Sequence, residues 1–179
     1  NKKYFSKKNI KTWKKIPQTL SQSKNYFLIG FPRSGTTLLD TILRSHSKID
    51  LIEDKPIVPE IKIFFNKNMK GKYDQINKND LEKIQNLYYD RINFYKENKS
   101  NTKIIIDKMP NNSIEVGFLH RIFPKSKFIF SLRHPCDCVL SCFINRFKMN
   151  DAMINCTSIE DTVNFYNHIM SLWKLYKSN

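Results

Sequence analysis

The chain has 179 residues and a formal net charge of +15, from 31 Lys and Arg side chains against 16 Asp and Glu. This length suits about one domain with a real core, and the 40% hydrophobic and 13% aromatic contents exclude a disordered chain. No apolar run approaches the ~20 residues that span a bilayer, so we expect no membrane span. The lysines are scattered in ones and twos, so the charge by itself does not indicate nucleic-acid binding.

The four cysteines are Cys136, Cys138, Cys142 and Cys156. Three of them crowd one expected helix at a C-x-C-x-x-x-C spacing, which matches no common zinc pattern. We therefore expect reduced structural thiols, no metal site and a reducing, cytoplasmic compartment.

The first part of the chain alternates between extended and helical patterns. Residues 1–23 are basic and polar and predict an N-terminal linker, whereas residues 24–179 predict one folded domain. A buried strand is expected at 26–30 and a second strand at 49–52. Between them a helix at 36–45 is expected to present an inner face formed by Leu38, Leu39, Ile42 and Leu43.

The alternation continues to the end of the chain. Residues 57–73 are ambiguous and helical near 61–65, and the clearest helix runs over 80–98 with Asp80 as its cap. Thr157 and Glu160 predict a capping box that opens a last helix through residue 176. The remaining expected elements are a strand at 103–107, a helix at 114–123, a strand at 127–132 and a helix that starts at Pro135.

Strands that alternate with helices predict a parallel α/β sheet covered on both faces. Ligands in such sheets bind at the carboxyl ends of the strands. Four sequence positions follow directly on the expected strands, so we expect them to converge on one crevice: residues 30–37, Glu53 with Asp54, Asp107 with Lys108, and Arg133 with His134.

The sequence FLIGFPRSGTTLL after residue 26 predicts a strand, a tight loop and a helix. Gly30 and Gly35 occupy the first and sixth positions of a phosphate-binding loop, but Thr36 stands where a nucleoside-triphosphate enzyme has its lysine. Backbone N–H groups at such a helix N-terminus bind an anionic group, and Arg33 can fork onto two of its oxygens. The missing lysine argues against the β- and γ-phosphates of ATP or GTP as that group.

The other strand ends carry side chains that suit group transfer. Lys108 can stabilise charge on a leaving group, and Glu53 or Asp54 can accept a proton from a substrate hydroxyl. Arg133 and Ser141, two helical turns apart, can clamp a second phosphate. Asp107 could instead be the metal-holding aspartate of a nucleoside-triphosphatase, although Thr36 speaks against that role because lysine and metal act together there.

Three segments resemble sulfotransferases that use 3′-phosphoadenylyl sulfate. FPRSGTTLL at residues 31–39 is similar to their 5′-phosphosulfate loop, and FSLRHP at 130–135, continued to Ser141, is similar to their 3′-phosphate motif. DKMPNN at 107–112 is similar to a segment of tyrosylprotein sulfotransferases and of bacterial sulfotransferases often found behind tetratricopeptide repeats. The resemblance is closest to these last two groups.

The resemblance implies a three-layer parallel sheet with a P-loop, of the sulfotransferase type. It also implies in-line transfer of a sulfuryl group from 3′-phosphoadenylyl sulfate to a hydroxyl or phenol, without a metal. Lys108 would stabilise the bridging oxygen, and the base would be Asp54 by spacing, with Glu53 as the alternative. The donor would be held by Arg33, Ser34, Gly35, Thr36 and Thr37 at its 5′-phosphosulfate and by Arg133 and Ser141 at its 3′-phosphate.

The resemblance also bears on the extent of the protein and on its partners. Residues 24–179 correspond to the N-terminal portion of such a catalytic domain, which we expect to be truncated here, and tetratricopeptide repeats could lie upstream. The acceptor stays open between peptide tyrosine, carbohydrate and small hydroxyl compounds. Two other functions also stay open: a degenerate P-loop nucleoside-triphosphate kinase or hydrolase, and a basic nucleic-acid-binding module.

Overall fold

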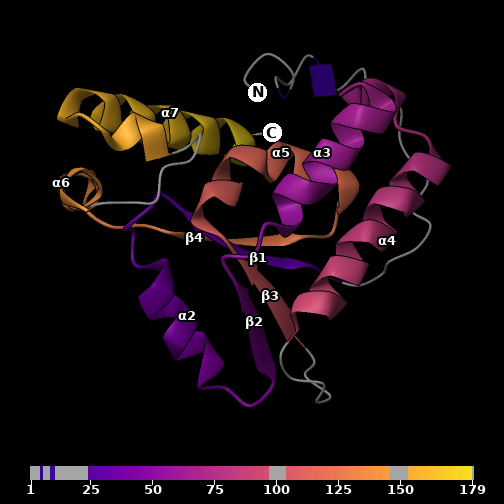
Figure 1. Cartoon of the computed structure of the whole chain (residues 1–179), viewed down its shortest axis with the longest axis horizontal. Coiled ribbons are helices and arrows are strands. Elements are labelled where there is room, and N and C mark those ends of the chain that lie inside the picture. Colours follow the sequence, from indigo (N-terminus) through magenta and orange to yellow (C-terminus); the bar gives the residue numbers. More distant parts are fainter. Residues whose placement is uncertain (1–4, 6–8, 11–23, 97–103, 146–152, 179) are drawn as a thin grey trace.

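A computed structural model of the chain describes residues 5, 9–10, 24–96, 104–145 and 153–178. Most of the expected linker at 1–23 lies outside these residues. The described residues form one sheet of four parallel strands in the order β2-β3-β1-β4 (Figure 1). The strands are β1 (Tyr26–Gly30), β2 (Ile49–Glu53), β3 (Ile104–Lys108) and β4 (Lys127–Ser131), close to the four that the sequence predicts.

Helices cover the sheet on both faces, which confirms the predicted three-layer α/β fold. Figure 1 shows α2 on one face and α3, α4 and α5 on the other, while α6 and α7 lie together beside β4. Within the described ranges, none of the helices is both long and apolar enough to cross a bilayer. Their bounds are α2 (Thr36–Arg44), α3 (Ile57–Met69), α4 (Lys78–Tyr95), α5 (Val116–Ile122), α6 (Pro135–Ile144) and α7 (Ile159–Lys177), with short 3-10 turns at η1 (Tyr73–Gln75), η2 (Pro110–Glu115) and η3 (Met153–Cys156).

The two faces of the sheet enclose separate apolar clusters, because successive side chains of a strand point to opposite faces. Phe27 and Ile29 of β1 join the large cluster under α3, α4 and α5. Leu28 joins the smaller cluster under α2, together with Leu39 and Leu43.

The predicted inner face of α2 is partly wrong. Leu38 and Ile42 are 68% and 57% exposed. The side turned to the sheet instead carries Thr36, Leu39, Asp40 and Leu43, with Thr36 and Asp40 buried. Their spacing of i, i+3, i+4 and i+7 is that of one helical face. Because two residues of that face are polar, the spacing of the apolar residues alone did not identify it.

Two helix caps lie one to three residues from their predicted positions. Asn77, and not Asp80, caps α4: its side chain accepts a hydrogen bond from the backbone N–H of Asp80 at 2.9 Å. Ser158 caps α7 and accepts from the backbone N–H of Asp161, where the sequence predicts Thr157 and Glu160. Asn77 and Asp80 close a reciprocal capping box, whereas at α7 the Asp161 side chain accepts from the Ser158 hydroxyl and the return bond to the N-cap backbone is not formed.

Phe5 of the N-terminal segment packs into the domain and is 2% exposed. Its ring meets the edges of Tyr73 and Tyr176, with centroid distances of 5.1 and 5.7 Å. A Cβ atom at Gly117 would lie 2.5 Å from this ring, so glycine lets α5 approach it.

Asp107 on β3 is buried on the face opposite to Lys108. The hydroxyl of Tyr88 donates to its Oδ2 at 3.4 Å, and no described residue bonds its Oδ1. Burial raises the pKa of this carboxyl to about 7. Because the unfolded state loses this proton near pH 4, the carboxyl disfavours the folded state increasingly from pH 4 to 7.

We therefore expect Asp107→Asn to flatten the pH dependence of stability. Wild-type protein should lose a few kcal/mol (at about 1.4 kcal/mol per pH unit) of unfolding free energy between pH 5 and 8 relative to the variant. Urea unfolding at several pH values measures this difference. Parallel pH profiles for the two proteins would show that Asp107 does not carry the effect.

Candidate active site at the carboxyl ends of the strands

The loop between β1 and α2 turns sharply and folds back on β4. Ser34 donates its N–H to the carbonyl of Phe31 at 3.1 Å, and Arg33 and Gly35 have left-handed φ angles of 66° and 93°. A Cβ atom at Gly30 would lie 2.6 Å from Ser34 Oγ. The two glycines therefore make this loop conformation accessible, whereas Arg33 adopts it against its intrinsic preference.

Side chains of β4 and α6 hold the carbonyl groups of this loop. The thiol of Cys142 donates to the carbonyl of Pro32 at 3.4 Å, and Ser131 Oγ donates to that of Ser34 at 2.9 Å. The carbonyl of Arg33 between them accepts from Arg133 Nη1 at 3.3 Å. Three successive carbonyls are thus engaged on the β4–α6 side of the loop.

The first N–H groups of α2 come next along the chain. They have no carbonyl one turn earlier to bond, and Gly35 at the N-cap supplies no side-chain acceptor. Gly35, Thr36 and Thr37 line a pocket, so these positive helix-end dipoles are placed beside it. The local backbone therefore favours an anionic ligand in that pocket.

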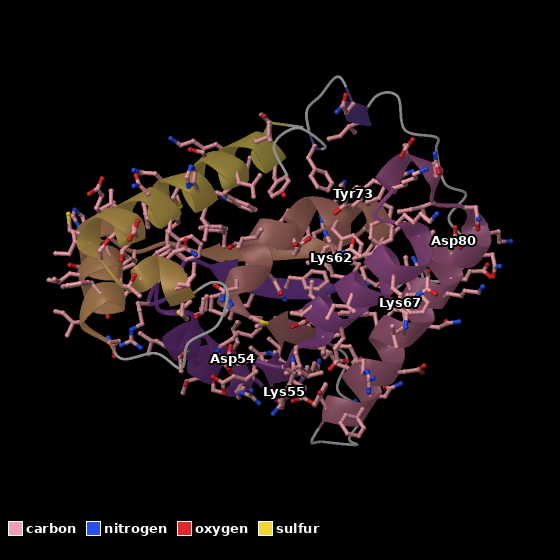
Figure 2. All side chains as sticks on the ribbon, turned by 45° about the horizontal axis from the view of Figure 1, so that its top comes forward. Asp54, Lys55, Lys62, Lys67, Tyr73 and Asp80 are labelled. Carbon is pink, nitrogen blue, oxygen red and sulfur yellow. The ribbon has the colours of Figure 1, made fainter. Side chains whose placement is uncertain are left out.

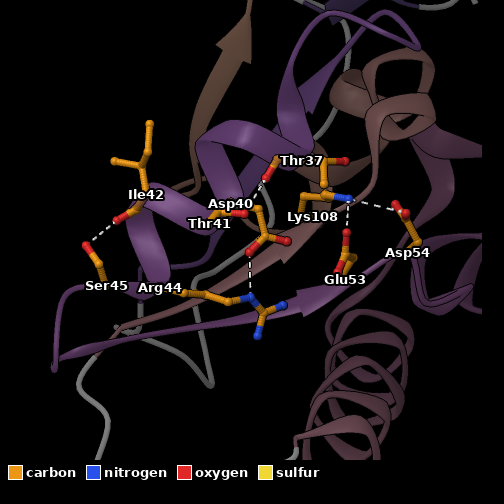
Figure 3. A network of polar contacts seen from close by, with 9 residues as sticks. All are labelled: Thr37, Asp40, Thr41, Ile42, Arg44, Ser45, Glu53, Asp54 and Lys108. Atoms are coloured by element: carbon orange, nitrogen blue, oxygen red, sulfur yellow. Dashed lines mark hydrogen bonds and ion pairs between the residues drawn. The ribbon is translucent and has the colours of Figure 1, made fainter.

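The second component of the site is a buried lysine held by two carboxylates, which Figure 3 shows beside the start of α2. Lys108 Nζ lies 2.7 Å from Glu53 Oε1 and 3.2 Å from Asp54 Oδ2. The lysine side chain is 1% exposed, whereas the two carboxylates are 43% and 59% exposed. Asp54 turns back toward Lys108 because its φ is 51° and its N–H donates to the Lys108 carbonyl at 2.8 Å.

This pairing sets the charge state of Glu53. The hydrogen bond from Lys108 lowers the pKa of Glu53 below its ordinary value, against a smaller opposing effect of burial. Glu53 is therefore ionised at neutral pH and keeps the buried ammonium compensated.

The third component joins the loop to α6. Arg33 Nε donates to Ser141 Oγ at 3.0 Å, and Arg133 Nε lies 3.4 Å from Asp137 Oδ2. These contacts form because β4 is the direct neighbour of β1, with Gly30 opposite Ser131. Arg133 and Ser141 therefore lie on the same edge of the sheet as Gly35.

A pocket of about 340 Å³ collects these groups at the carboxyl edge of the sheet. Its charged walls are Arg33, Lys108 and Arg133 against Asp54 alone, which favours an anion. Among the described residues, no three His, Cys, Asp or Glu side chains are grouped to hold a metal ion. The full lining is Pro32, Arg33, Gly35, Thr36, Thr37, Asp54, Lys108, Pro110 and Arg133.

Most of the site residues expected from the sequence are brought together here, with differences in detail. Ser34 is buried beneath the loop, and Glu53 and Ser141 touch lining residues without lining the pocket themselves. Asp107, expected at the same crevice, points to the opposite face of the sheet toward Tyr88. A strand that sends Lys108 into the site must send its neighbour Asp107 away.

The sequence reasoning missed the residues that anchor the loop from below. Cys142 and Cys138, whose thiol donates to the Arg33 carbonyl at 3.9 Å, were expected only as structural thiols, and Ser131 was not singled out. The thiols stand one helical turn apart, so they share the face of α6 that meets the loop, but nothing in their spacing indicates carbonyl acceptors.

The model of the Sulfotransferase family matches residues 26–177. The chain belongs to the sulfotransferase family. The match starts at β1 and runs to the end of α7, so it includes every strand end of the site.

One similar protein is much longer than this chain. The chain is 31% identical over 131 residues to a protein of Aquifex aeolicus (strain VF5) described as an uncharacterized protein. That match covers 68% of this chain and 17% of the relative. The chain therefore spans only a small part of the length of that relative.

The pairing at Lys108 predicts a measurable titration change at Glu53. Lys108→Met removes the largest cause of its lowered pKa, so the pKa of Glu53 should rise toward its ordinary value near 4.3. Carboxyl-carbon NMR titration reads this directly. Lys55→Gln is the matched control, because Lys55 acts on Glu53 only through the weakest of the identified charge effects. An equal rise in both variants would contradict the pairing.

The loop anchor predicts a stability difference between two variants of Cys142. Burial raises the pKa of this thiol to about 12, so it stays protonated and can donate to Pro32. Cys142→Ala leaves the buried carbonyl unpaired, whereas Cys142→Ser keeps a donor. The alanine variant should be less stable than the serine variant by about 1–3 kcal/mol in urea unfolding. Equal stability of the two would show that the bond does not hold the loop.

Proposed function

We propose that this chain is the donor-binding part of an enzyme that transfers a sulfuryl group from 3′-phosphoadenylyl sulfate to a hydroxyl acceptor. The observation that carries the proposal is the shared pocket of the α2 N-terminus and the buried Lys108. Membership in the sulfotransferase family supports it. The lack of a loop lysine at Thr36 fits a sulfuryl group, which carries less charge than a phosphoryl group.

The donor's two anionic groups match two sets of side chains and amides at the site. The N–H groups of residues 35–37 and the guanidinium of Arg33 suit the 5′-phosphosulfate. Arg133 and Ser141, joined to the loop through Arg33, suit the 3′-phosphate. A 3′-phosphate subsite would separate this donor from ATP.

The transfer step needs a cation at the leaving group and a base at the acceptor. As the acceptor oxygen bonds to sulfur, the bond from sulfur to the bridging phosphate oxygen breaks, and Lys108 stabilises the negative charge left on that oxygen. The hydroxyl proton passes to a carboxylate, Asp54 or Glu53, both of which contact Lys108. The products are the sulfated acceptor and adenosine 3′,5′-bisphosphate.

Donor binding and transfer test the proposal together in the full-length protein. Adenosine 3′,5′-bisphosphate should raise the melting temperature more than ATP with magnesium does. With sulfur-labelled donor, Lys108→Ala and Arg33→Ala should each lower transfer by about 10²–10³-fold. Lys108→Ala should still bind the bisphosphate, because the N–H groups of residues 35–37 and the side chains of Arg33 and Arg133 remain to hold its two phosphates.

Lys125→Ala is the matched control, because Lys125 is an exposed cation just before β4, at the far end of that strand from the pocket. It should leave both binding and transfer unchanged. A preference for ATP with magnesium, or full transfer by both site variants, would overturn the proposed function.

A further inference from the structure

A second pocket opens beside the first, at the outer edge of β2. It has a volume of about 200 Å³ and is lined by Arg44, Leu51, Ile52, Glu53, Lys55 and Tyr95. Strand β2 is one of the two edge strands of the sheet that the described residues form. We call this the Arg44 pocket.

The two pockets are linked through the contacts of Lys108. Asp54 and Lys108 line the donor pocket, whereas Glu53 lines the Arg44 pocket. Both carboxylates contact the same ammonium, at 3.2 and 2.7 Å. A transfer between two bound molecules needs reacting atoms about 3–3.5 Å apart, which two pockets linked through one lysine allow.

The strand offers this pocket its backbone and not its apolar side chains. Leu51 and Ile52 are 4% and 2% exposed because their side chains pack in the two cores. The N–H of Asp54 bonds the Lys108 carbonyl of β3, so by alternation the N–H and C=O groups of Leu51 and Glu53 point to the outer edge. Such a wall suits hydroxyl groups better than an aromatic ring or a lipid chain.

Two cations also face the Arg44 pocket. Arg44 Nε bonds Asp40 at 2.5 Å, and Figure 3 shows its terminal nitrogens directed away from that carboxylate. Lys55 lies beside Asp54 in Figure 2, with its ammonium 5.7 Å from the centre of the Tyr95 ring. Within the described ranges Lys55 makes no ion pair, while Glu53 and Asp40 are already paired. The donors left over therefore suit an additional anionic group.

Resting on the proposed function, we propose that the Arg44 pocket is the acceptor subsite and that it takes an acidic carbohydrate. A sugar hydroxyl lies at Glu53, and a carboxylate of the same saccharide contacts Lys55 and the terminal nitrogens of Arg44. Glu53 then takes the hydroxyl proton as the acceptor oxygen bonds to sulfur and the bridging S–O bond breaks. Asp54, which lines the donor pocket, holds Lys108 in place during this step.

The test uses the full-length protein, sulfur-labelled donor and four acceptors: polygalacturonic acid, neutral dextran, a tyrosine-containing acidic peptide and 4-nitrophenol. Transfer to the polyuronate should exceed transfer to the other three. Lys55→Ala should raise KM for the polyuronate about tenfold and leave kcat within threefold, because it removes a binding contact and no reacting group. The control variant is Lys67→Ala, because Lys67 is an exposed lysine of α3 that lies apart from Lys55 in Figure 2. It should change neither KM nor kcat.

Binding separates this inference from the proposed function. Calorimetry should show oligogalacturonate binding to protein saturated with adenosine 3′,5′-bisphosphate, and weaker binding to Lys55→Ala. No transfer to the polyuronate, preferred transfer to the peptide or phenol, or an unchanged KM in Lys55→Ala overturns the inference, even where the bisphosphate binds. Failure to bind the bisphosphate overturns the proposed function itself.

Discussion

The geometry of the site depends on the direction in which the carbonyl groups of the loop between β1 and α2 point. Pro32, Arg33 and Ser34 each direct a carbonyl to a donor from β4, from α6 or from the segment between them. A peptide unit that turns its carbonyl one way turns its N–H the other way, so the contacts of the Pro32 and Ser34 carbonyls help to direct the N–H groups of Arg33 and Gly35 toward the pocket. The N–H of Ser34 instead bonds the Phe31 carbonyl. Parallel pairing of β1 with β4 makes this arrangement possible, because it sets Gly30 beside Ser131.

A buried ammonium is the second constraint, since taking a charge out of water costs several kcal/mol unless it is paired. Glu53 and Asp54 supply that pairing for Lys108 from the neighbouring strand. Both carboxylates remain about half exposed, so they can meet a substrate while the lysine stays fixed. The same contacts thus stabilise the fold and place a cation between two pockets.

The sequence predicted the α/β architecture because the apolar runs, the helical spacing of apolar residues and the loop motif all indicated alternating strands and helices. Apolar runs at β1, β3 and β4 ended in residues that a parallel sheet must gather at one edge, whereas the strand order β2-β3-β1-β4 comes from the structure alone. Asp107 shows where this reasoning stops: strand ends converge as backbone, but alternation sends every second side chain to the other face. The prediction of the inner face of α2 was partly wrong because a charged residue, Asp40, is buried there through its ion pair with Arg44.

Contacts between residues far apart in the chain could not be predicted from the sequence. Cys142 meets the Pro32 carbonyl across 110 positions of chain, and no local pattern indicates such a partner. The Arg44 pocket likewise unites the end of α2, the edge of β2 and the end of α4.

Backbone amide shifts on adding adenosine 3′,5′-bisphosphate to ¹⁵N-labelled protein test the central claim most directly. The account predicts that the largest changes fall on Gly35, Thr36 and Thr37, with further changes at Arg133 and Ser141. Unchanged loop amides, with shifts confined to the amino ends of the strands near Ser126 and Lys127, would contradict it.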